Sequence, residues 1–173
     1  MSDLNYSLIF SPPLTKGYLA IGICPGRKDD KYNRDLSTDL TYIKQHFNII
    51  ISLQENFEYA AHGVPDYVNI VTNYGIPLVS VPIKDRNISD LNTTIQLVDY
   101  IYNLLEQGYQ IYMHCLGGLG RSGTIAACVG LKLGIRYVDI IKYIRDRRPY
   151  AIQTKSQKNM ILSYNNYLLS TKQ

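Results

Sequence analysis

Apolar residues along the chain follow two patterns, which together predict alternating strands and helices. Continuous or β-branched apolar runs predict strands over residues 18–24, 48–53, 76–83 and 110–114. Apolar positions three or four residues apart predict helices over residues 35–47, 65–74, 91–105, 122–133, 138–147 and 155–169. Glycines follow three of these helices, at Gly75, Gly108 and Gly134, where glycine commonly ends a helix.

Strands that alternate with helices indicate a largely parallel sheet with helices on both faces. The sequence has no internal repeat, low-complexity stretch or linker, so we expect a single domain over residues 1–173. The predicted fold class is α/β, with a central, mostly parallel, twisted sheet flanked by helices. Ligands of such sheets usually bind beyond the carboxyl ends of the strands, which directs attention to the loops after Ile83 and His114.

The composition fits one globular domain that needs neither disulfides nor a structural metal. The 173 residues are 46% hydrophobic and 18% charged, and folding at this length buries roughly 70% of the unfolded surface. The formal charge of +4 suits an anionic substrate but is too small to require one. The short basic cluster Arg145, Arg147 and Arg148 fits a solvated helix face as well as a functional role.

The three cysteines, Cys24, Cys115 and Cys128, show no paired spacing, which argues against a disulfide framework and suits a reducing compartment. No histidine has zinc-ligand spacing with a cysteine pair, so we expect no metal or other cofactor. The sequence contains neither a signal-peptide pattern nor an apolar run long enough for a membrane span. We therefore expect a soluble protein of the cytoplasm or nucleus, without a membrane partner.

The residues from His114 to Thr124 combine a cysteine, four glycines and an arginine between a predicted strand and a predicted helix. The glycines allow a tight turn whose N–H groups converge at the positive end of a helix, which is an anion site. Cys115 at the start of this loop would be favoured as a thiolate, with its pKa lowered from about 8.5 to ~4–6. Arg121, six residues later, can present its planar fork to two phosphate oxygens.

Two other interpretations fit this loop less well. A nucleotide-binding loop requires a lysine where Arg121 stands and uses backbone where Cys115 stands. A glycine-rich turn with a buried cysteine is a common structural feature, because free cysteines are often core residues. That explanation suits Cys24 and Cys128, but for Cys115 it leaves His114, Arg121 and the following Ser-Gly unexplained.

The loop resembles His-Cys-x5-Arg-Ser/Thr, the signature of protein tyrosine and dual-specificity phosphatases. Further similarity to the kinase-associated phosphatase (cyclin-dependent kinase inhibitor 3) family lies in residues 24–26, 82–85, 117–122 and 151–154. The resemblance covers about residues 20–165 and implies a dual-specificity phosphatase-like fold. It also implies dephosphorylation of phosphoproteins, without a metal, through a phosphocysteine intermediate.

In this scheme Cys115 attacks phosphorus, while Arg121 and the loop N–H groups stabilise the equatorial oxygens of the transition state. The resemblance implies that the hydroxyl of Ser122 helps the thiolate leave in the second step. It also implies that His114 orders the loop and tunes the thiol, although a plain buried histidine at a strand end is the alternative. The expected phosphate-binding positions are Leu116, Gly117, Gly118, Leu119, Gly120 and Arg121.

The leaving oxygen needs a proton, and a carboxylic acid on a neighbouring loop is the expected source. We predict Asp85, which follows a strand expected to lie beside the Cys115 strand and stands about 30 residues before the cysteine, as in the family. Asp90 is the competitor, but its position just before the predicted helix at Leu91 favours helix N-capping.

Gln153 and Gln157 follow the penultimate predicted helix, where family members often use a polar residue to position the hydrolytic water. Both also fit ordinary surface glutamines. Lys84 and Arg86 flank the predicted acid and could attract phosphate, although solvated charges need no special explanation.

The five residues between Cys115 and Arg121 carry no charge, which disfavours an inositol-lipid substrate because phosphoinositide phosphatases of this superfamily typically place lysines there. Gly120 replaces the asparagine of RNA 5′-triphosphatases, and no extended basic and aromatic surface is evident, so we expect no nucleic-acid partner. The chain is too short for the added recognition segment of large tyrosine phosphatases. We expect a shallow pocket that accepts phospho-Ser/Thr as well as phospho-Tyr, with a phosphoprotein, a protein kinase among the candidates, as partner. The oligomeric state is left open.

Two alternatives from other functional classes remain. A phosphoprotein-binding module on a phosphatase fold would usually lack the cysteine, the arginine or the aspartate, whereas all three are present here. A rhodanese-like sulfur carrier also has a loop cysteine, but the Asp85 loop and the residues after Arg121 fit it poorly.

Overall fold

Five strands form one sheet in the computed structural model, which describes residues 3–172. The strands are β1 (Tyr6–Phe10), β2 (Tyr18–Gly22), β3 (Ile49–Ser52), β4 (Leu78–Ser80) and β5 (Gln110–His114). The helices are α1 (Leu36–His46), α2 (Asn56–Ala61), α3 (Tyr67–Asn73), α4 (Leu91–Glu106), α5 (Gly120–Lys132), α6 (Tyr137–Arg147) and α7 (Lys155–Ser170).

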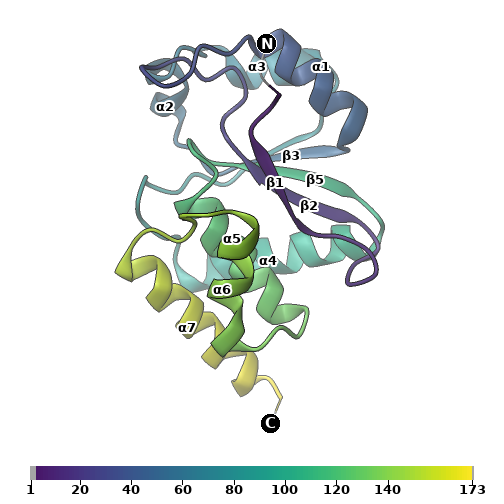
Figure 1. Ribbon diagram of the computed structural model, residues 1–173, viewed down its shortest axis with the longest axis vertical. Helices are drawn as coiled ribbons and strands as arrows, with labels where there is room; N and C mark the ends of the chain where they lie inside the picture. The colour runs from purple at the N-terminus through teal and green to yellow at the C-terminus, as the bar shows by residue number, and fades with distance from the viewer. Residues whose placement is uncertain (1–2, 173) are drawn as a thin grey trace.

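The sheet is mostly parallel and lies between two layers of helices. Its strand order is β1-β2-β5-β3-β4, and only the β1–β2 pair is antiparallel. Figure 1 shows α1, α2 and α3 on one side of the sheet and α4, α5, α6 and α7 on the other. The α/β class predicted from the sequence, with helices on both faces, is confirmed.

Successive residues of the central strands point to opposite faces of the sheet and contribute to two separate cores. In β5, Ile111 and Met113 belong to one core, whereas Tyr112 belongs to the other. In β3, Ile50 and Ile51 divide in the same way. Burial on both faces explains why these strands read as continuous apolar runs rather than as an alternating pattern.

The helix that follows the cysteine loop, α5, is buried from Gly120 to Leu131 and contacts α4, α6 and α7. Such a setting holds the start of the helix, and therefore the loop before it, in a fixed position. No helix among residues 3–172 combines the length and the apolar character required to cross a membrane.

Two elements, β1 and α2, were not predicted from the sequence. In β1, an edge strand, only Ile9 and Phe10 are buried, so its apolar pattern is short. Helix α2 has six residues, too few for a helical repeat to become visible. The predicted strands and helices all occur with ends shifted by a few residues, and α5 begins at Gly120 rather than at residue 122.

The strand before Asp85 does not lie beside the strand that carries Cys115, so this part of the sequence-based prediction is wrong. Strand β4 pairs with β3, and β3 separates it from β5. All four residues of β3 are buried, and such an apolar strand occupies the centre of the sheet. After β4 the chain runs along the end of β3, where Val81 N donates to Ser52 O and Ile83 N donates to Leu53 O, both at 2.9 Å. This path brings Asp85 back to the site.

Candidate active site

Cys115 directly follows β5, and Arg121 lies in the first turn of α5, so the strand and the helix fix the two ends of the loop between them. Both side chains are buried, with Cys115 3% and Arg121 2% exposed. Because α5 begins at Gly120, the arginine belongs to the rigid helix rather than to the turn.

The backbone of the loop has its carbonyl groups bonded to protein and its N–H groups free. Leu116 O accepts from Cys24 N at 3.1 Å, Leu119 O accepts from Ile152 N at 3.1 Å, and Gly120 O accepts from a threonine hydroxyl of α5 at 2.7 Å. Among residues 3–172, no group accepts a hydrogen bond from the N–H groups of residues 116–121. Buried N–H groups normally have partners, so this array of donors at a helix N-terminus is suited to an anion.

Arg148 bonds the two remaining loop carbonyls. Its Nη2 donates to Gly117 O at 2.9 Å and its Nε to Gly118 O at 3.1 Å, while Nη1 donates to Asn5 Oδ1 at 2.7 Å. These bonds tie the loop to the segment before β1 and keep the carbonyl oxygens turned away from the free N–H groups. Arg148, at 7% exposed, is therefore not part of a solvated helix face.

Gly118 is required by both the conformation and the packing of the loop. Its φ is 66°, a region that residues with a Cβ rarely adopt. A Cβ at this position would lie 2.3 Å from Gly22 O of β2. The loop can therefore approach the sheet only with glycine at this position.

A buried carboxylate holds the guanidinium of Arg121. Glu58 accepts from Nη1 through Oε2 and from Nη2 through Oε1, both at 2.8 Å, and Ile83 O accepts from Nη1 at 2.9 Å. Glu58 is 4% exposed and also accepts the N–H of Glu55 at 2.7 Å, within the capping box of α2. Arg121 Nε is buried without a hydrogen-bond partner among the described residues. The side chain is thus oriented by Glu58 and keeps one donor for a ligand.

Sequence reasoning did not identify Glu58. Helix α2 is short, and the ion pair joins residues 63 positions apart. The one signal was the spacing of Glu55 and Glu58, which fits a capping box but begins with a residue that rarely caps helices.

Asp85 and Asp90 have different surroundings. Asp85 Oδ1 lies 3.3 Å from Arg121 Nη2 and accepts the N–H of Arg86 at 2.8 Å, and its side chain is 57% exposed. Asp90 caps α4 by accepting the N–H of Thr93 at 2.9 Å, as predicted from its position. Only Asp85, of these two carboxylates, lines the cavity beside Cys115.

His114 lies behind the loop and is neutral. It is fully buried, and burial lowers its pKa to about 4. Its Nδ1 bonds to Cys115 O at 3.1 Å, and because a carbonyl can only accept, Nδ1 carries the proton. Its Nε2 therefore accepts from the hydroxyl of Tyr67 at 2.7 Å, and burial keeps that hydroxyl protonated by raising the pKa of Tyr67 well above its usual range. The histidine thus fixes the carbonyl at the first loop residue.

The remaining predicted site residues divide into those in the cavity and those beside it. Ser122 is fully buried in the first turn of α5, and its Oγ has no partner within residues 3–172. Gln153 lines the cavity. Gln157 does not line it, because its Oε1 accepts from Gln153 N at 2.8 Å and Thr154 N at 3.1 Å, at the start of α7.

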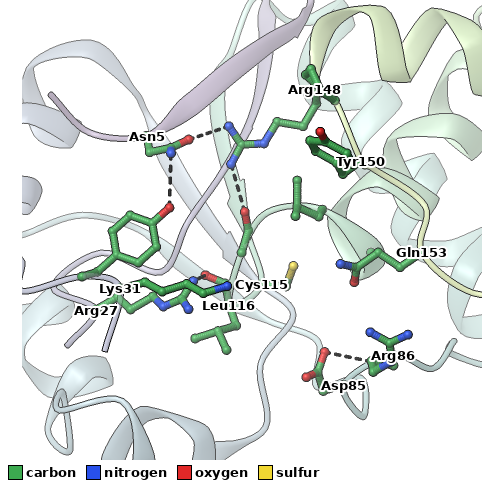
Figure 2. A pocket seen from close by; sticks show the side chains of 15 residues that line it. Asn5, Arg27, Lys31, Asp85, Arg86, Cys115, Leu116, Arg148, Tyr150 and Gln153 are labelled. Atoms are coloured by element: carbon green, nitrogen blue, oxygen red, sulfur yellow. Dashed lines mark hydrogen bonds between the residues drawn. The ribbon is translucent and has the colours of Figure 1, made fainter. Parts of the chain in front are cut away.

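The cavity in front of Cys115 has a volume of about 400 Å³ and a predominantly basic wall. Figure 2 shows Cys115 between Lys31 on one side and Arg86 with Gln153 on the other. Its charged lining residues are Arg27, Lys31, Asp85, Arg86 and Arg148. Sequence reasoning considered the charges beside Asp85 and in the cluster of residues 145–148, but it missed Arg27 and Lys31, which enter from the segment between β2 and α1.

Cys24 and Cys128, the core cysteines, are fully buried and, like Cys115, free. Burial raises the pKa of both core thiols, so they remain protonated. Their interpretation as packing residues is confirmed. In the described part of the chain, no group of three or more His, Cys, Asp or Glu side chains is arranged to hold a metal ion.

The strand, the cysteine loop and the helix have the arrangement of the protein tyrosine and dual-specificity phosphatase class, and comparison with known families agrees. The matching family model is described as "Polymorphic toxin system, DSP-PTPase phosphatase" and spans residues 30–135, more than half of the chain. The chain belongs to this DSP-PTPase phosphatase family.

Individual relatives confirm the resemblance to the kinase-associated branch. Cyclin-dependent kinase inhibitor 3 of Rattus norvegicus is 29% identical over 159 residues, which cover 86% of this chain and 73% of the relative. A crystal structure of kinase-associated phosphatase, with its catalytic cysteine replaced by serine, has a TM-score of 0.89 at 24% identity and 98% coverage of both chains. The human tyrosine phosphatase-like serine/threonine/tyrosine-interacting protein shares the fold, with a TM-score of 0.65 at 14% identity and coverage of 87% and 93%.

Proposed function

We propose that this chain is a metal-independent phosphoprotein phosphatase that hydrolyses phospho-Tyr, phospho-Ser/Thr or both through a phosphocysteine intermediate. The observation that carries the proposal is the loop after β5, in which the N–H groups of residues 116–121 have no partner among residues 3–172 while the carbonyls are bonded elsewhere. The free Nε of Arg121 adds a charged donor beside them. Such an arrangement is suited to a phosphoryl group, because its oxygens require several fixed donors at once.

In the first step the Cys115 thiolate attacks phosphorus, and the bond from phosphorus to the substrate oxygen breaks. The loop N–H groups and Arg121 stabilise the charge on the equatorial oxygens. Asp85 gives its proton to the leaving oxygen, which departs as an alcohol or phenol. The distance of 3.3 Å between Asp85 Oδ1 and Arg121 Nη2 supports this role, because it brings a carboxyl group close to the arginine proposed to bind phosphate.

In the second step water attacks the phosphocysteine, and the sulfur–phosphorus bond breaks. Asp85 takes the proton from this water, and the hydroxyl of Ser122, which has no other partner in residues 3–172, donates to the departing thiolate. Gln153 lines the cavity and is the better candidate for positioning the water, because the amide oxygen of Gln157 is committed to the start of α7.

A phosphorylated protein is the proposed substrate, and a phosphorylated kinase is one candidate because of the similarity to cyclin-dependent kinase inhibitor 3. We propose that the protein acts in the cytoplasm or nucleus. The low exposure of Cys115, at 3%, and the exposed aromatic ring of Tyr150 in the cavity wall suit phospho-Tyr.

The test is hydrolysis of aryl phosphates by wild type, Cys115→Ser and Asp85→Asn, with EDTA present, between about pH 5 and about pH 8. We expect EDTA-resistant activity that Cys115→Ser abolishes. We expect Asp85→Asn to lower turnover about a hundredfold, most for poor leaving groups. Asp90→Asn is the matched control, since asparagine still caps α4 and should preserve activity.

The alternative is a phosphoprotein-binding module, favoured by the shared fold with the human phosphatase-like interacting protein. Wild type that is folded and reduced but binds phosphopeptide without turnover would support the module and refute the phosphatase.

A further inference from the structure

The cavity in front of Cys115 continues into a second, more open groove. This groove is lined by Arg86, Arg145, Tyr150, Ile152 and Gln153. Three of these residues, Arg86, Tyr150 and Gln153, also line the catalytic cavity. A substrate that fills the catalytic cavity can therefore extend directly into the groove.

The groove carries two positive charges and no carboxylate. Arg145 donates its Nε to Ala151 O and its Nη2 to Ile152 O, both at 2.9 Å, which leaves Nη1 without a partner among residues 3–172. The guanidinium of Arg86 has no ion-pair partner in the described part of the chain either. By contrast, Lys142 on α6 and Arg136, which directly precedes this helix, are each paired with an aspartate.

The backbone of the groove is held in an unusual conformation. At three non-glycine positions among residues 3–172, φ is positive: 61° at Arg86, 69° at Tyr150 and 63° at Ile152. All three residues line the groove. Such strain costs about 1–3 kcal/mol per residue and typically persists at functional sites, where the surroundings enforce it. Here the bonds from Arg145 hold the carbonyls of Ala151 and Ile152, and the neighbouring Tyr150 is 83% exposed.

From these observations we infer that the groove binds a second phosphate of the substrate, so that the preferred substrates are protein segments with two neighbouring phosphorylated residues. The inference rests on the proposed phosphatase function and specifies its substrate class. A phosphate group offers two arginines more acceptor oxygens and more negative charge than a single carboxylate does. We therefore infer a phosphate as the ligand of this pair. Tyr150, between the cavity and the groove, contacts the substrate chain that joins the two phosphorylated residues.

The test compares a peptide that carries one phosphotyrosine with a series of peptides that each carry one additional phosphoserine. The position of the phosphoserine varies across the series, on both sides of the phosphotyrosine. We expect the second phosphate to raise kcat/KM about five- to tenfold at one or more spacings, and we expect added salt to reduce this ratio. Arg86→Gln should bring the ratio close to one. Lys84→Gln removes the same charge two positions away, from a side chain outside both cavities, and should preserve the ratio.

Several results would overturn the inference. One is a ratio near one at every spacing in an active wild type, which would leave the phosphatase proposal intact. Another is a ratio that depends on Lys31 rather than Arg86, which would move the second phosphate to the opposite wall of the cavity. A third is a preference for a doubly phosphorylated inositol headgroup over all the peptides.

Affinities separate failure of the inference from failure of the phosphatase proposal. If wild type hydrolyses no phosphopeptide, the proposed function is wrong. Dissociation constants of Cys115→Ser for the same peptides then decide whether the groove binds a second phosphate. A five- to tenfold preference for the doubly phosphorylated peptide that Arg86→Gln removes would support the groove, and equal affinities would refute it.

Discussion

Replacing Glu58 with glutamine tests whether the buried ion pair behind the loop prepares Arg121 for phosphate. The carboxylate accepts two hydrogen bonds of 2.8 Å from the guanidinium, and neither partner is more than 4% exposed. Glutamine has nearly the same shape but offers one oxygen and presents N–H donors to the other arginine nitrogen. The variant therefore leaves the buried guanidinium with one of the two Glu58 oxygens that accepted from it.

The cost can be worked out from the surrounding contacts. Removing one partner of a buried ion pair typically costs about 3–5 kcal/mol. The retained amide oxygen, Ile83 O at 2.9 Å and Asp85 Oδ1 at 3.3 Å still face the guanidinium, so we expect about 2–3 kcal/mol for Glu58→Gln. For a domain of this size, that corresponds to a melting temperature lower by about 4–12 °C. A misdirected guanidinium should lower kcat by about ten- to a hundredfold.

The assay combines thermal unfolding with hydrolysis of an aryl phosphate, and Glu55→Gln serves as the matched control. Glu55 lies in the same capping box and loses the same charge, but it makes no contact with Arg121. We expect this control to melt within a few degrees of wild type and to keep its activity. If Glu58→Gln also melts and turns over substrate like the control, the carboxylate does not orient the arginine, and the reasoning is refuted.

Three further predictions concern the loop and its support. Folding lowers the pKa of His114 from about 6.5 to about 4, so the unfolded chain binds the proton more readily between these values and stability is lost as the pH falls through them. The difference in unfolding free energy between wild type and His114→Gln should narrow by on the order of 3 kcal/mol from neutral to acid pH in denaturant titrations, and a constant difference would contradict a buried neutral histidine. Gly118→Ala should abolish hydrolysis, because its Cβ would lie 2.3 Å from a β2 carbonyl. Gly108→Ala is the control: it is also at positive φ but has open space around it, so it should lower the free energy of unfolding by about 1 kcal/mol and keep activity. Iodoacetamide should alkylate Cys115 in the folded protein and spare the core cysteines; mass spectrometry that finds the core cysteines modified first would refute this order.

Those parts of the site that are contiguous in sequence could be predicted, because their chemistry depends on local spacing. The loop from Cys115 to Arg121 lies between a strand and a helix as expected, since an apolar run, a set of glycines and a helical pattern follow one another directly. Asp90 could be assigned to capping for the same reason, because a cap and its helix are neighbours in the chain.

Parts of the site that come from distant segments and are not marked by the family resemblance could not be predicted, because a single sequence does not reveal which loops meet. Glu58 contacts Arg121 across 63 residues, and Arg148 reaches the loop carbonyls across about 30. The order of strands was missed in the same way: nothing in the apolar run before Asp85 reveals that β3 lies between it and β5. Pairing is decided by burial of whole strands in three dimensions, which local periodicity does not report.

The signature residues and the residues that hold them therefore carry different information. A chain could keep every residue from His114 to Ser122 and still lose the array of N–H donors if Arg148 no longer bonded the carbonyls of Gly117 and Gly118. Freed carbonyl oxygens could then turn toward the phosphate and repel it, since acceptors and phosphate oxygens are both negative. Here all of the loop carbonyls are bonded and Arg121 is paired with a buried carboxylate, so the donor geometry that we propose for binding phosphate exists before a substrate arrives. Preorganisation of this kind, more than the signature itself, argues for an active enzyme over a binding module, because fixed donors stabilise a transition state without a cost of reorganisation.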